Sequence, residues 1–343
     1  MTIQEMADKI DIIIPVYNAF TKVKRTIYSY GINTKYHFIL VVDGDNIDYE
    51  PLKDFFKDIQ DIDIYYLPEN AGPGIARNYG IDKATREYIT FIDAGDTIYN
   101  TAVLENVIKM IIESPNYLMV SCAHYEKRDD KLETVAPQHN RMHGKFFKRE
   151  FVNDYNIRFN PECSKMNEDI GFNFIARAIA SHLADIANTQ CILHLTDGLI
   201  VWESDEDSIT RQNNYAFYYQ KNNEGLSKNA IYSMNHLKQY QIPETYALDI
   251  MYQSLPSLYI FYYSCVFMRP EFEAEMYAGA KLFFNYLRDN DIKIDIQALT
   301  RYYAQQMRGV YCSDWDPFTM GIPDMTIIQW INTFFMEDNN TEN

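Results

Sequence analysis

Short apolar runs alternate with helical patterns over the first 125 residues, and this alternation limits the possible fold more than any other feature of the chain. The run IDIIIPV at residues 10–16 is almost entirely apolar and rich in β-branched residues, which is typical of a strand buried on both faces. Similar runs follow at residues 37–43, 63–69, 87–93 and 116–125. The sequence therefore predicts five strands in this part of the chain.

Helical patterns fill the segments between these runs. The first begins at Thr21, whose hydroxyl can cap a helix, and stops at Gly31. Further helices are predicted at residues 51–56, 72–84 and 101–113. Strands that alternate with helices of roughly ten residues form right-handed βαβ units. The pattern thus predicts an α/β fold, with a Rossmann-like, mostly parallel sheet and helices on both faces.

The alternation weakens after residue 125. Residues 126–137 are polar and charged, which indicates a loop. A helix at residues 169–180 and a hairpin at residues 189–202 are predicted to complete the first domain.

Long, aromatic-rich helical patterns begin at about Asn214. We therefore predict two domains, with the α/β fold in residues 1–213 and a helical domain or extension in residues 214–343. A core role is favoured over a sugar-stacking surface for four tyrosines at helical spacing, Tyr252, Tyr259, Tyr262 and Tyr263. Breaks between the helices are predicted at Pro243, Pro256 and Pro270.

Polar residues follow each of the first four predicted strands. They are Pro15–Asn18, Asp43–Asn46, Asn70–Gly74 with Arg77 just beyond, and Asp93–Asp96. In a parallel sheet these positions share one edge, beyond the carboxyl ends of the strands, where ligands bind. Each segment alone could be a turn or a helix cap, but four in register favour a binding site.

Two carboxylates at this edge suggest a metal ion. Asp93 and Asp96 are costly to hold near one another unless a cation or hydrogen bonds compensate. Mg²⁺ and Mn²⁺ prefer carboxylate and phosphate oxygens. With Arg77 nearby, the pattern predicts a divalent ion together with a phosphate group.

The charge balance argues against a polynucleotide partner. The chain has 31 Lys and Arg against 48 Asp and Glu, a net charge of −17, whereas nucleic-acid binders carry a basic footprint. The same field disfavours adhesion to anionic lipid. A local basic stripe in the C-terminal helices keeps a nucleic-acid partner open as an alternative, at Lys228, Lys238, Lys281 and Arg288.

The sequence carries no visible signal for export or for the membrane. The polar N-terminus lacks the apolar core of a signal peptide, and the most apolar stretch, residues 257–268, is shorter than the roughly 20 residues of a transmembrane helix. The five cysteines are scattered without a C-x-x-C pair, so neither a disulfide framework nor a zinc ribbon is expected. These features predict a soluble, cytoplasmic protein.

Several of these segments together resemble one enzyme family. The runs IDIIIPVYNA, VVDGDN and ENAGPGIARNYGIDKATREYITFIDAGD resemble the N-terminal half of the family-2 glycosyltransferases, which have the GT-A fold. Residues 142–172, with the pair Glu168-Asp169, are similar to the family's acceptor-side block, and WESDEDSITRQ is similar to the stretch that closes the domain. The resemblance covers about residues 10–212 in order. It implies a transferase that uses a nucleoside-diphosphate sugar.

The resemblance also implies residue roles on the donor side. Asp43 would accept a hydrogen bond from the base edge, typically of uracil, and Arg77 would pair with the donor phosphates or shield the metal. Asp96 would be the main ligand of Mn²⁺ or Mg²⁺, and Asp93 would contact the ion, the ribose or the sugar. The implied nucleotide-sugar-binding residues are Pro15, Val16, Tyr17, Asn18, Asp43, Asn70, Gly72, Arg77 and Asp93.

On the acceptor side, the resemblance implies that Asp169, supported by Glu168, is the general base. The chemistry agrees, because transfer needs a neutralised leaving diphosphate and a deprotonated acceptor hydroxyl on the opposite face of the sugar. One displacement with one base inverts the anomeric centre, so we predict an inverting enzyme, with UDP-sugar as the preferred donor class. His143, Gly144 and Lys145 would shape the acceptor pocket. The acceptor is a carbohydrate or another hydroxyl compound, since bacterial members commonly build surface polysaccharide.

The chain departs from the family pattern at two positions. Val42 occupies the first position of the usual Asp-Asp pair after the second strand, and Gly95 replaces the third carboxylate of the usual Asp-x-Asp-Asp motif. A metal ion would then rely on Asp96 and the donor diphosphate. The change at Gly95 also motivates an alternative, a nucleotide-sugar-binding module without catalysis.

Other readings have less support. Gly72-Pro73-Gly74 begins like a dinucleotide fingerprint, but Arg77 stands at its third glycine and the motif follows the third strand. His139 and His143 have the i, i+4 spacing of a zinc pair, but their surroundings indicate a loop. For the acidic residues 203–207, a solvated connection is favoured over a lid that orders over the donor. Transfer to modified nucleic-acid bases, known in some viral relatives, stays an alternative that the charge disfavours.

Overall fold

The computed structural model describes residues 1–128, 131–137, 141–165, 167–203, 215–268, 270–310 and 326–336. It divides into two compact units, Met1–Ser208 and Ile209–Asn343. The predicted boundary at residues 213 and 214 lies outside the described residues. The same holds for His139, residues 204–207 and the Ser-Ile-Thr stretch.

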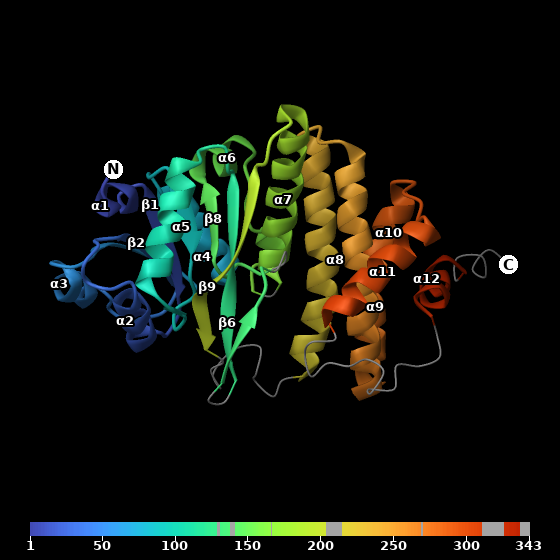
Figure 1. Cartoon of the computed structure of the whole chain (residues 1–343). Helices are drawn as coiled ribbons and strands as arrows, with labels where there is room; N and C mark the ends of the chain where they lie inside the picture. Colours follow the sequence, from blue (N-terminus) through green and yellow to red (C-terminus); the bar gives the residue numbers. More distant parts are fainter. Residues whose placement is uncertain are drawn as a thin grey trace. The chain divides into compact units, whose positions relative to one another are not determined.

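The described part of the first unit contains one nine-stranded sheet (Figure 1). Its first four strands are β1 (Ile10–Val16), β2 (His37–Asp43), β3 (Asp61–Leu67) and β4 (Tyr88–Phe91). They run parallel in the order β3-β2-β1-β4. The chain begins with α1 (Ile3–Ala7), and α2 (Phe20–Ser29), α3 (Pro51–Phe56) and α4 (Pro73–Lys83) connect the strands. This arrangement confirms the predicted βαβ units.

The other half of the sheet is mixed. It contains β5 (Thr97–Ile98), β6 (Met119–Arg128), β7 (Lys131–Val135), β8 (Lys145–Lys148) and β9 (Ile192–Glu203), with α5 (Thr101–Glu113), α6 (Arg149–Asp154), the 3₁₀ turn η1 (Pro161–Cys163) and α7 (Glu168–Ala187). β8 is antiparallel to both β4 and β6, and β6 is parallel to β9. β5 and β7 pair antiparallel with β9 and β6. Beyond β4 the sheet continues in the order β8-β6-β9-β5 and includes antiparallel pairs.

Alternate residues of the central strands fill two cores, one on each face of the sheet. Ile12 and Ile14 of β1 belong to a core shared with α1, α2 and α5. Ile13 faces α4, where a Cβ on Gly80 would lie 2.4 Å from its Cγ2 atom. Burial on both faces explains why the strand sequence is continuously apolar, and the glycine permits the close approach of α4.

Two predicted elements of the first unit are wrong. Residues 189–202 do not form a hairpin, because the turn-like residues Thr196 and Asp197 sit at a break in register within the single strand β9. Residues 126–137 are not simply a loop, because β6 continues into them and β7 pairs with it. β7 is almost fully exposed, so its polar sequence is that of a solvated edge strand.

Two predicted helix signals also act differently. Helix α2 begins after Ala19 rather than being capped by Thr21. The Tyr49 hydroxyl accepts the N–H of Ala19 at 3.0 Å, so a tertiary contact replaces the cap. Pro256 does not break the chain but lies inside helix α9 (Glu244–Met268), where its buried neighbours Leu255 and Leu258 hold the helix by packing.

The second unit consists of helices. They are α8 (Tyr215–Gln239), α9, the 3₁₀ turn η2 (Pro270–Phe272), α10 (Glu273–Asp289), α11 (Ile296–Val310) and α12 (Ile327–Met336). Its core is aromatic: Trp330 contacts Tyr259, Tyr262 and Phe284 with ring centroids 5.4–5.7 Å apart. The four tyrosines predicted to be core residues are buried. Among the described helices, none is both long enough and apolar enough to cross a bilayer.

Candidate functional site

The loops after β1, β2 and β3 are tied together by two carboxylates, Asp43 and Asp45. Asp43, 3% exposed at the end of β2, accepts the backbone N–H groups of Ala71 and Gly72, both at 2.8 Å. Gly72 has a φ of +94°, and a Cβ there would lie 2.6 Å from the carbonyl oxygen of Ser164, so the turn into α4 requires glycine. Asp43 thus fastens this loop, and its predicted contact with the base stays a prediction.

A second carboxylate, which sequence reasoning did not select, fixes the loop after β1. Asp45 accepts the N–H of Asn18 at 2.6 Å and the hydroxyl of Tyr49 at 3.0 Å. Asn18 is held at a φ of +49°, and Tyr17 beside it is 51% exposed. Pro15 and Val16 end β1, and Val16 is buried. The first and second loops therefore form one backbone surface, with Tyr17 projecting from it.

The third loop lies against the segment before α7. The carbonyl oxygen of Asn70 accepts from Lys165 Nζ at 3.1 Å, and Gly74 N–H donates to the carbonyl oxygen of Ser164 at 2.9 Å. The Ser164 hydroxyl donates to the carbonyl oxygen of Ala71 at 2.5 Å. These contacts place the start of α7 beside the start of α4.

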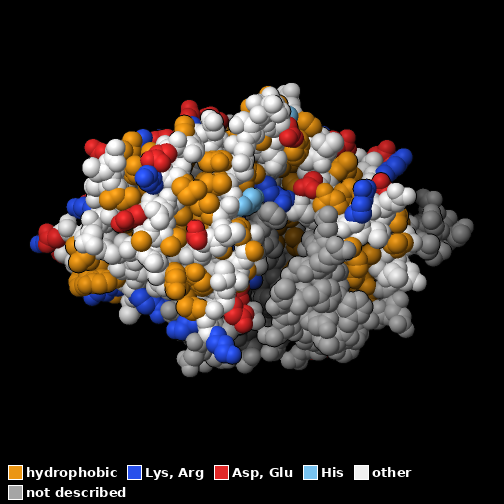
Figure 2. All heavy atoms as spheres, viewed as in Figure 1, with side chains coloured by type: hydrophobic (Ala, Val, Ile, Leu, Met, Phe, Trp, Pro, Cys, Tyr) orange, Lys and Arg blue, Asp and Glu red, His pale blue; other side chains and the backbone are white. Residues whose placement is uncertain are grey.

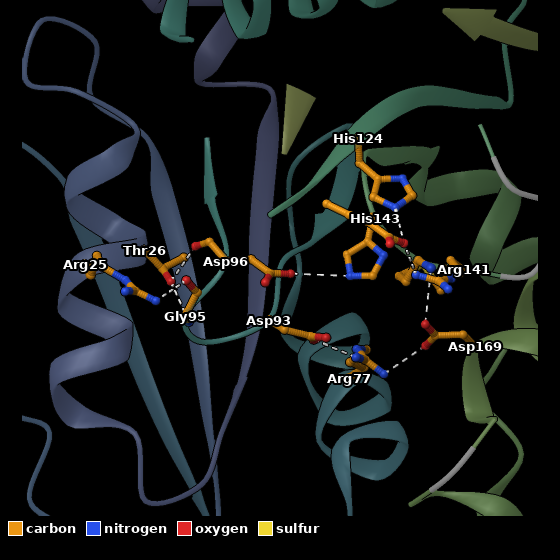
Figure 3. Close-up of polar contacts among 12 residues, drawn as sticks. Arg25, Thr26, Arg77, Asp93, Gly95, Asp96, His124, Arg141, His143 and Asp169 are labelled. Carbon is orange, nitrogen blue, oxygen red and sulfur yellow. Dashed lines mark hydrogen bonds and ion pairs between the residues drawn. The ribbon is translucent and has the colours of Figure 1, made fainter. Parts of the chain in front are cut away.

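A buried arginine brings three predicted carboxylates together, and Figure 3 shows two of them, Asp93 and Asp169. Arg77 on α4 is 2% exposed. Its Nη2 atom donates to Asp93 at 2.7 Å, and its Nη1 atom donates to Glu168 at 2.8 Å and Asp169 at 3.1 Å. The guanidinium is therefore shared between the loop after β4 and the start of α7, which are far apart in the sequence.

Charge and burial set the protonation of this group. Desolvation raises the pKa of Asp93, but the charge of Arg77 more than reverses it, so the pKa lies below its ordinary value. Burial and the neighbouring Asp169 raise the pKa of Glu168 to about 7 despite Arg77. The same three carboxylates raise the pKa of Arg77 against its desolvation.

Asp169 is oriented from two sides. Besides Arg77 Nη1 at one oxygen, the backbone N–H of Met142 donates to its other oxygen at 3.1 Å. Its side chain is 23% exposed. The turn that carries Met142 is held by the buried Lys145, whose Nζ donates to the carbonyl oxygen of Arg141. Burial lowers the pKa of Lys145 to about 7, although Asp169 opposes this shift.

Two aspartates and a histidine form a possible cation site. One ligand atom from each of Asp93, Asp96 and His143 lies within 4.8 Å of the others, and His143 Nε2 is 3.4 Å from Asp96 Oδ2. Desolvation lowers the pKa of His143, but the hydrogen bond and charge of Asp96 more than reverse this, so the pKa is raised. Two carboxylates and an imidazole are a ligand set that fits Mn²⁺, and less closely Mg²⁺. The residues therefore fit the predicted metal.

His143 is the member of this group that the sequence did not assign. The resemblance implies that His143 shapes the acceptor pocket, and the sequence disfavours a zinc pair with His139. The His143 ring stacks on His124 of β6 with centroids 5.0 Å apart. Burial, His143 and Arg141 lower the pKa of His124 to about 4. The neutral His124 ring thus packs against one face of the His143 ring. The pairing of β6 with β8 brings the two residues together.

Gly95 has a structural reason to replace a carboxylate. Its φ is +115°, a backbone conformation that residues with a Cβ rarely adopt. A side chain there would find space, with Arg25 and Lys22 the nearest groups at 3.6 and 3.7 Å. The missing carboxylate therefore follows from the path of the loop rather than from crowding.

Known proteins are similar to this chain in sequence and in fold. The family model described as Glycosyl transferase family 2 matches residues 11–170. An uncharacterized glycosyltransferase of Haemophilus influenzae is 33% identical over 120 residues, which are 34% of this chain and 46% of that protein. The chain spans less than half of the length of the first curated relatives, with 22% for two from Rickettsia.

Two solved structures are similar over most of the chain. S. aureus TarS 1-349, in complex with UDP-GlcNAc, has a TM-score of 0.51 at 13% identity and covers 82% of this chain and 92% of its own. The mannosyltransferase PcManGT from Pyrobaculum calidifontis, in complex with GDP-Man and Mn²⁺, has a TM-score of 0.50 at 13% identity and covers 95% and 84%. At such identity the likeness concerns the fold alone.

Proposed function

We propose that the chain transfers a sugar from a nucleoside-diphosphate sugar to an acceptor hydroxyl, because residues 11–170 match the model of glycosyl transferase family 2 and the fold is that of GT-A glycosyltransferases. The observation that carries the proposal is the shared guanidinium of Arg77, which links Asp93 on the donor side to Asp169 on the acceptor side. A donor and an acceptor that meet there would have a carboxylate on each side of the reacting carbon.

The donor would lie along the loops after β1, β2 and β3. These loops expose Tyr17, Asn18 and Asn70, while Asp43 and Asp45 hold the loops by hydrogen bonds. UDP-sugars are the first class to test, and GDP-sugars the second, because the two similar structures hold UDP-GlcNAc and GDP-Man. The sugar itself stays open.

Asp93, Asp96 and His143 would hold a divalent ion such as Mn²⁺. When bound, the ion would neutralise the charge that develops on the leaving diphosphate. Asp93 would share its carboxylate between the ion and Arg77, whose Nη2 atom donates to it. The His143 imidazole would in part replace the carboxylate that is missing at Gly95.

Asp169 would accept the proton of the acceptor hydroxyl. Both of its oxygens already receive one hydrogen bond, from Arg77 and from Met142, and this fixes the carboxylate plane while leaving lone pairs toward solvent. A single displacement with this base inverts the anomeric centre. A carbohydrate acceptor of the kind used in polysaccharide synthesis fits this chemistry, and the net charge of −17 disfavours a polynucleotide.

Release of nucleoside diphosphate tests the proposal. Purified protein is incubated with UDP-, GDP- and TDP-sugars and simple sugar acceptors, with Mn²⁺ or with chelator. We expect release from one donor, dependent on metal. Asp169→Asn should lower the rate by about 10²–10⁴-fold, the usual contribution of a general base. Asp96→Asn should reduce the increase in rate that Mn²⁺ produces.

Asp82→Asn is the matched control, because Asp82 is an exposed acid on the same helix as Arg77 and should leave the rate unchanged. Wild-type activity in Asp169→Asn would show that the base is another group. Donor binding without turnover under every condition would favour a nucleotide-sugar-binding module, and failure to bind any donor would refute the proposal.

A further inference from the structure

Helix α2 holds the loop that carries the metal-binding aspartates. The hydroxyl of Thr26 accepts the N–H of Gly95 at 2.9 Å and donates to the carbonyl oxygen of Asp96 at 2.8 Å. Arg25 Nη2 donates to the carbonyl oxygen of Gly95 at 2.7 Å. Figure 3 shows these contacts on the opposite side of the loop from His143. One turn of α2 therefore contacts three consecutive peptides of the loop, at the Gly95 N–H, the Gly95 carbonyl oxygen and the Asp96 carbonyl oxygen.

The position of Thr26 is not explained by helix formation. A threonine inside a helix is unfavourable by propensity, and its hydroxyl commonly bonds to a carbonyl of the preceding turn. Here the hydroxyl, which is fully buried, bonds instead to a loop 69 and 70 residues away in the chain. Since it acts as donor and acceptor at once, the direction of its hydrogen is fixed.

The loop has an internal hydrogen bond at this point, from the Asp96 N–H to the Asp93 carbonyl oxygen at 3.1 Å, and α2 adds its contacts to it. Glycine is the least restricted residue, and Gly95 has a φ of +115°, so its peptides would rotate easily without partners. Rotation there would move the next side chain, Asp96, which is 4% exposed. Its Oδ2 atom lies 3.4 Å from His143 Nε2. Ser29 extends the hold, because its Oγ accepts the N–H of Ile98 at 2.9 Å.

We propose that Thr26 is a positioning residue that aims the Asp96 carboxylate at a divalent cation, with Arg25 as the second contact. The inference rests on the proposed metal site and adds to it a residue outside the strand-end loops. In this view α2 supplies by hydrogen bonds the rigidity that the loop loses at Gly95. Thr26 itself does not touch the ion or the substrate.

Direct Mn²⁺ binding tests this inference without any glycosyl transfer. Titration followed by electron paramagnetic resonance gives the Mn²⁺ affinity of wild type, Thr26→Val and Thr26→Ser. Thr26→Val keeps the size but removes the hydroxyl, and we expect Mn²⁺ to bind about 10–100-fold more weakly, as is usual when a partner of a metal ligand is removed. Thr26→Ser should restore most of the affinity, because it restores the hydroxyl.

Two further variants separate positioning from general stability. Thr34→Val removes another buried hydroxyl of the same unit, one that bonds to Glu105, and should leave Mn²⁺ affinity unchanged. Arg25→Met removes the contact to Gly95 from an exposed side chain, so it is safe for folding, and should weaken Mn²⁺ binding in the same direction but less.

Several outcomes would overturn the inference. Unchanged Mn²⁺ affinity in Thr26→Val and Arg25→Met would show that the hold positions nothing. An equal loss in Thr34→Val would point to general destabilisation. Absence of Mn²⁺ binding in the wild type would refute the inference. The proposed transferase would then be tested separately, by measuring donor binding in the presence of chelator.

Discussion

Arg77 is the residue on which the charge balance of the site depends. Its buried guanidinium is shared by Asp93, Glu168 and Asp169. The resemblance to the family implied that Arg77 pairs with donor phosphates. In the structure its Nη atoms are engaged by carboxylates, and its two implied roles, pairing with donor phosphates and shielding the metal site, stay predictions.

Replacing Arg77 should therefore destabilise the protein. Arg77→Met leaves carboxylates without their shared cation, and breaking such a buried ion pair costs about 3–5 kcal/mol. We expect the lower end, about 3 kcal/mol, because Asp93 is half exposed and water can take over part of its solvation. Unfolding in urea at neutral pH measures the change in free energy.

Lys9→Met provides the comparison. Lys9 and Glu87 form an ion pair with side chains 36% and 39% exposed, and such pairs contribute about 0–1 kcal/mol. If Arg77→Met cost no more than Lys9→Met, the carboxylates would not depend on Arg77 for their charge. Glu168 would then be the first group to suspect of being protonated, because its pKa is about 7.

Motif reasoning could find the residues of the site that follow strands or open helices. The structure brings Asp93, Asp96 and Arg77, which follow predicted strands, into one region with Asp169, which the family resemblance singled out. His143 and Thr26 could not be found in this way. Their contacts join elements distant in the chain, and neither residue stands in a pattern that predicts its partner.

At the scale of elements, burial decided which predictions succeeded. The strands buried on both faces, β1 and β2, match their predicted bounds, because a continuous apolar run has few other uses. β5, β7 and β8 were not predicted. They are two to five residues long, and β7 is exposed, so neither length nor hydrophobicity marks them. Pairing with neighbours creates these strands.

The amino ends of β1, β2 and β3 carry a cluster of charged residues far from the site. Asp11 of β1 is fully buried and accepts the N–H groups of Thr85 and Arg86 at 2.7 and 2.9 Å. His37 of β2 lies between Asp11 at 2.6 Å and Asp63 at 3.3 Å. Desolvation lowers the pKa of His37, but the hydrogen bond and charge of Asp11 outweigh it, so the pKa is raised.

This cluster predicts a pH dependence of stability. The folded protein binds the His37 proton more tightly than the unfolded chain, whose histidine has a pKa of 6.5. The stabilising contribution is therefore complete below that pH and disappears as the pH rises through the folded-state value. The free-energy difference between wild type and His37→Asn should be larger at about pH 6 than at about pH 9.

Equilibrium unfolding at several pH values checks this. The effect of His37→Asn should keep one sign and shrink with rising pH, leaving only the hydrogen bond that a neutral imidazole can still make to Asp11. A loss that is constant across pH would show that His37 is neutral throughout. His182→Asn, on α7 away from this cluster, serves as the control for histidine removal.

At the scale of the whole molecule, the net charge of −17 affects how a cation is bound. The face seen in Figure 2 carries acidic and basic side chains side by side, so the excess of acid is not gathered into one patch there. The long-range field still attracts cations at low salt. Any measurement of Mn²⁺ affinity must therefore separate the site from this diffuse attraction, which salt screens over about 8–10 Å.

Ligand-induced stabilisation makes this separation. The described residues of the candidate site all lie in the unit Met1–Ser208. A ligand that binds only the folded state stabilises it by about 2.7 kcal/mol at a concentration 100 times its dissociation constant. For a unit of this size, that corresponds to a rise of roughly 5–10 °C in melting temperature. We expect this rise with Mn²⁺ and nucleoside diphosphate together, and a smaller one with either alone, because the diphosphate oxygens complete the coordination of the ion.

The experiment compares melting curves of wild type and Asp96→Asn at about 150 mM salt, where diffuse attraction is weak. Removing the metal with chelator should return the wild type to its unliganded melting temperature, and Asp96→Asn should show little metal-dependent rise. A rise that is equal in both proteins and disappears with added salt would mean that the cation is held by the net charge of the molecule. Asp93, Asp96 and His143 would then need another explanation for their convergence.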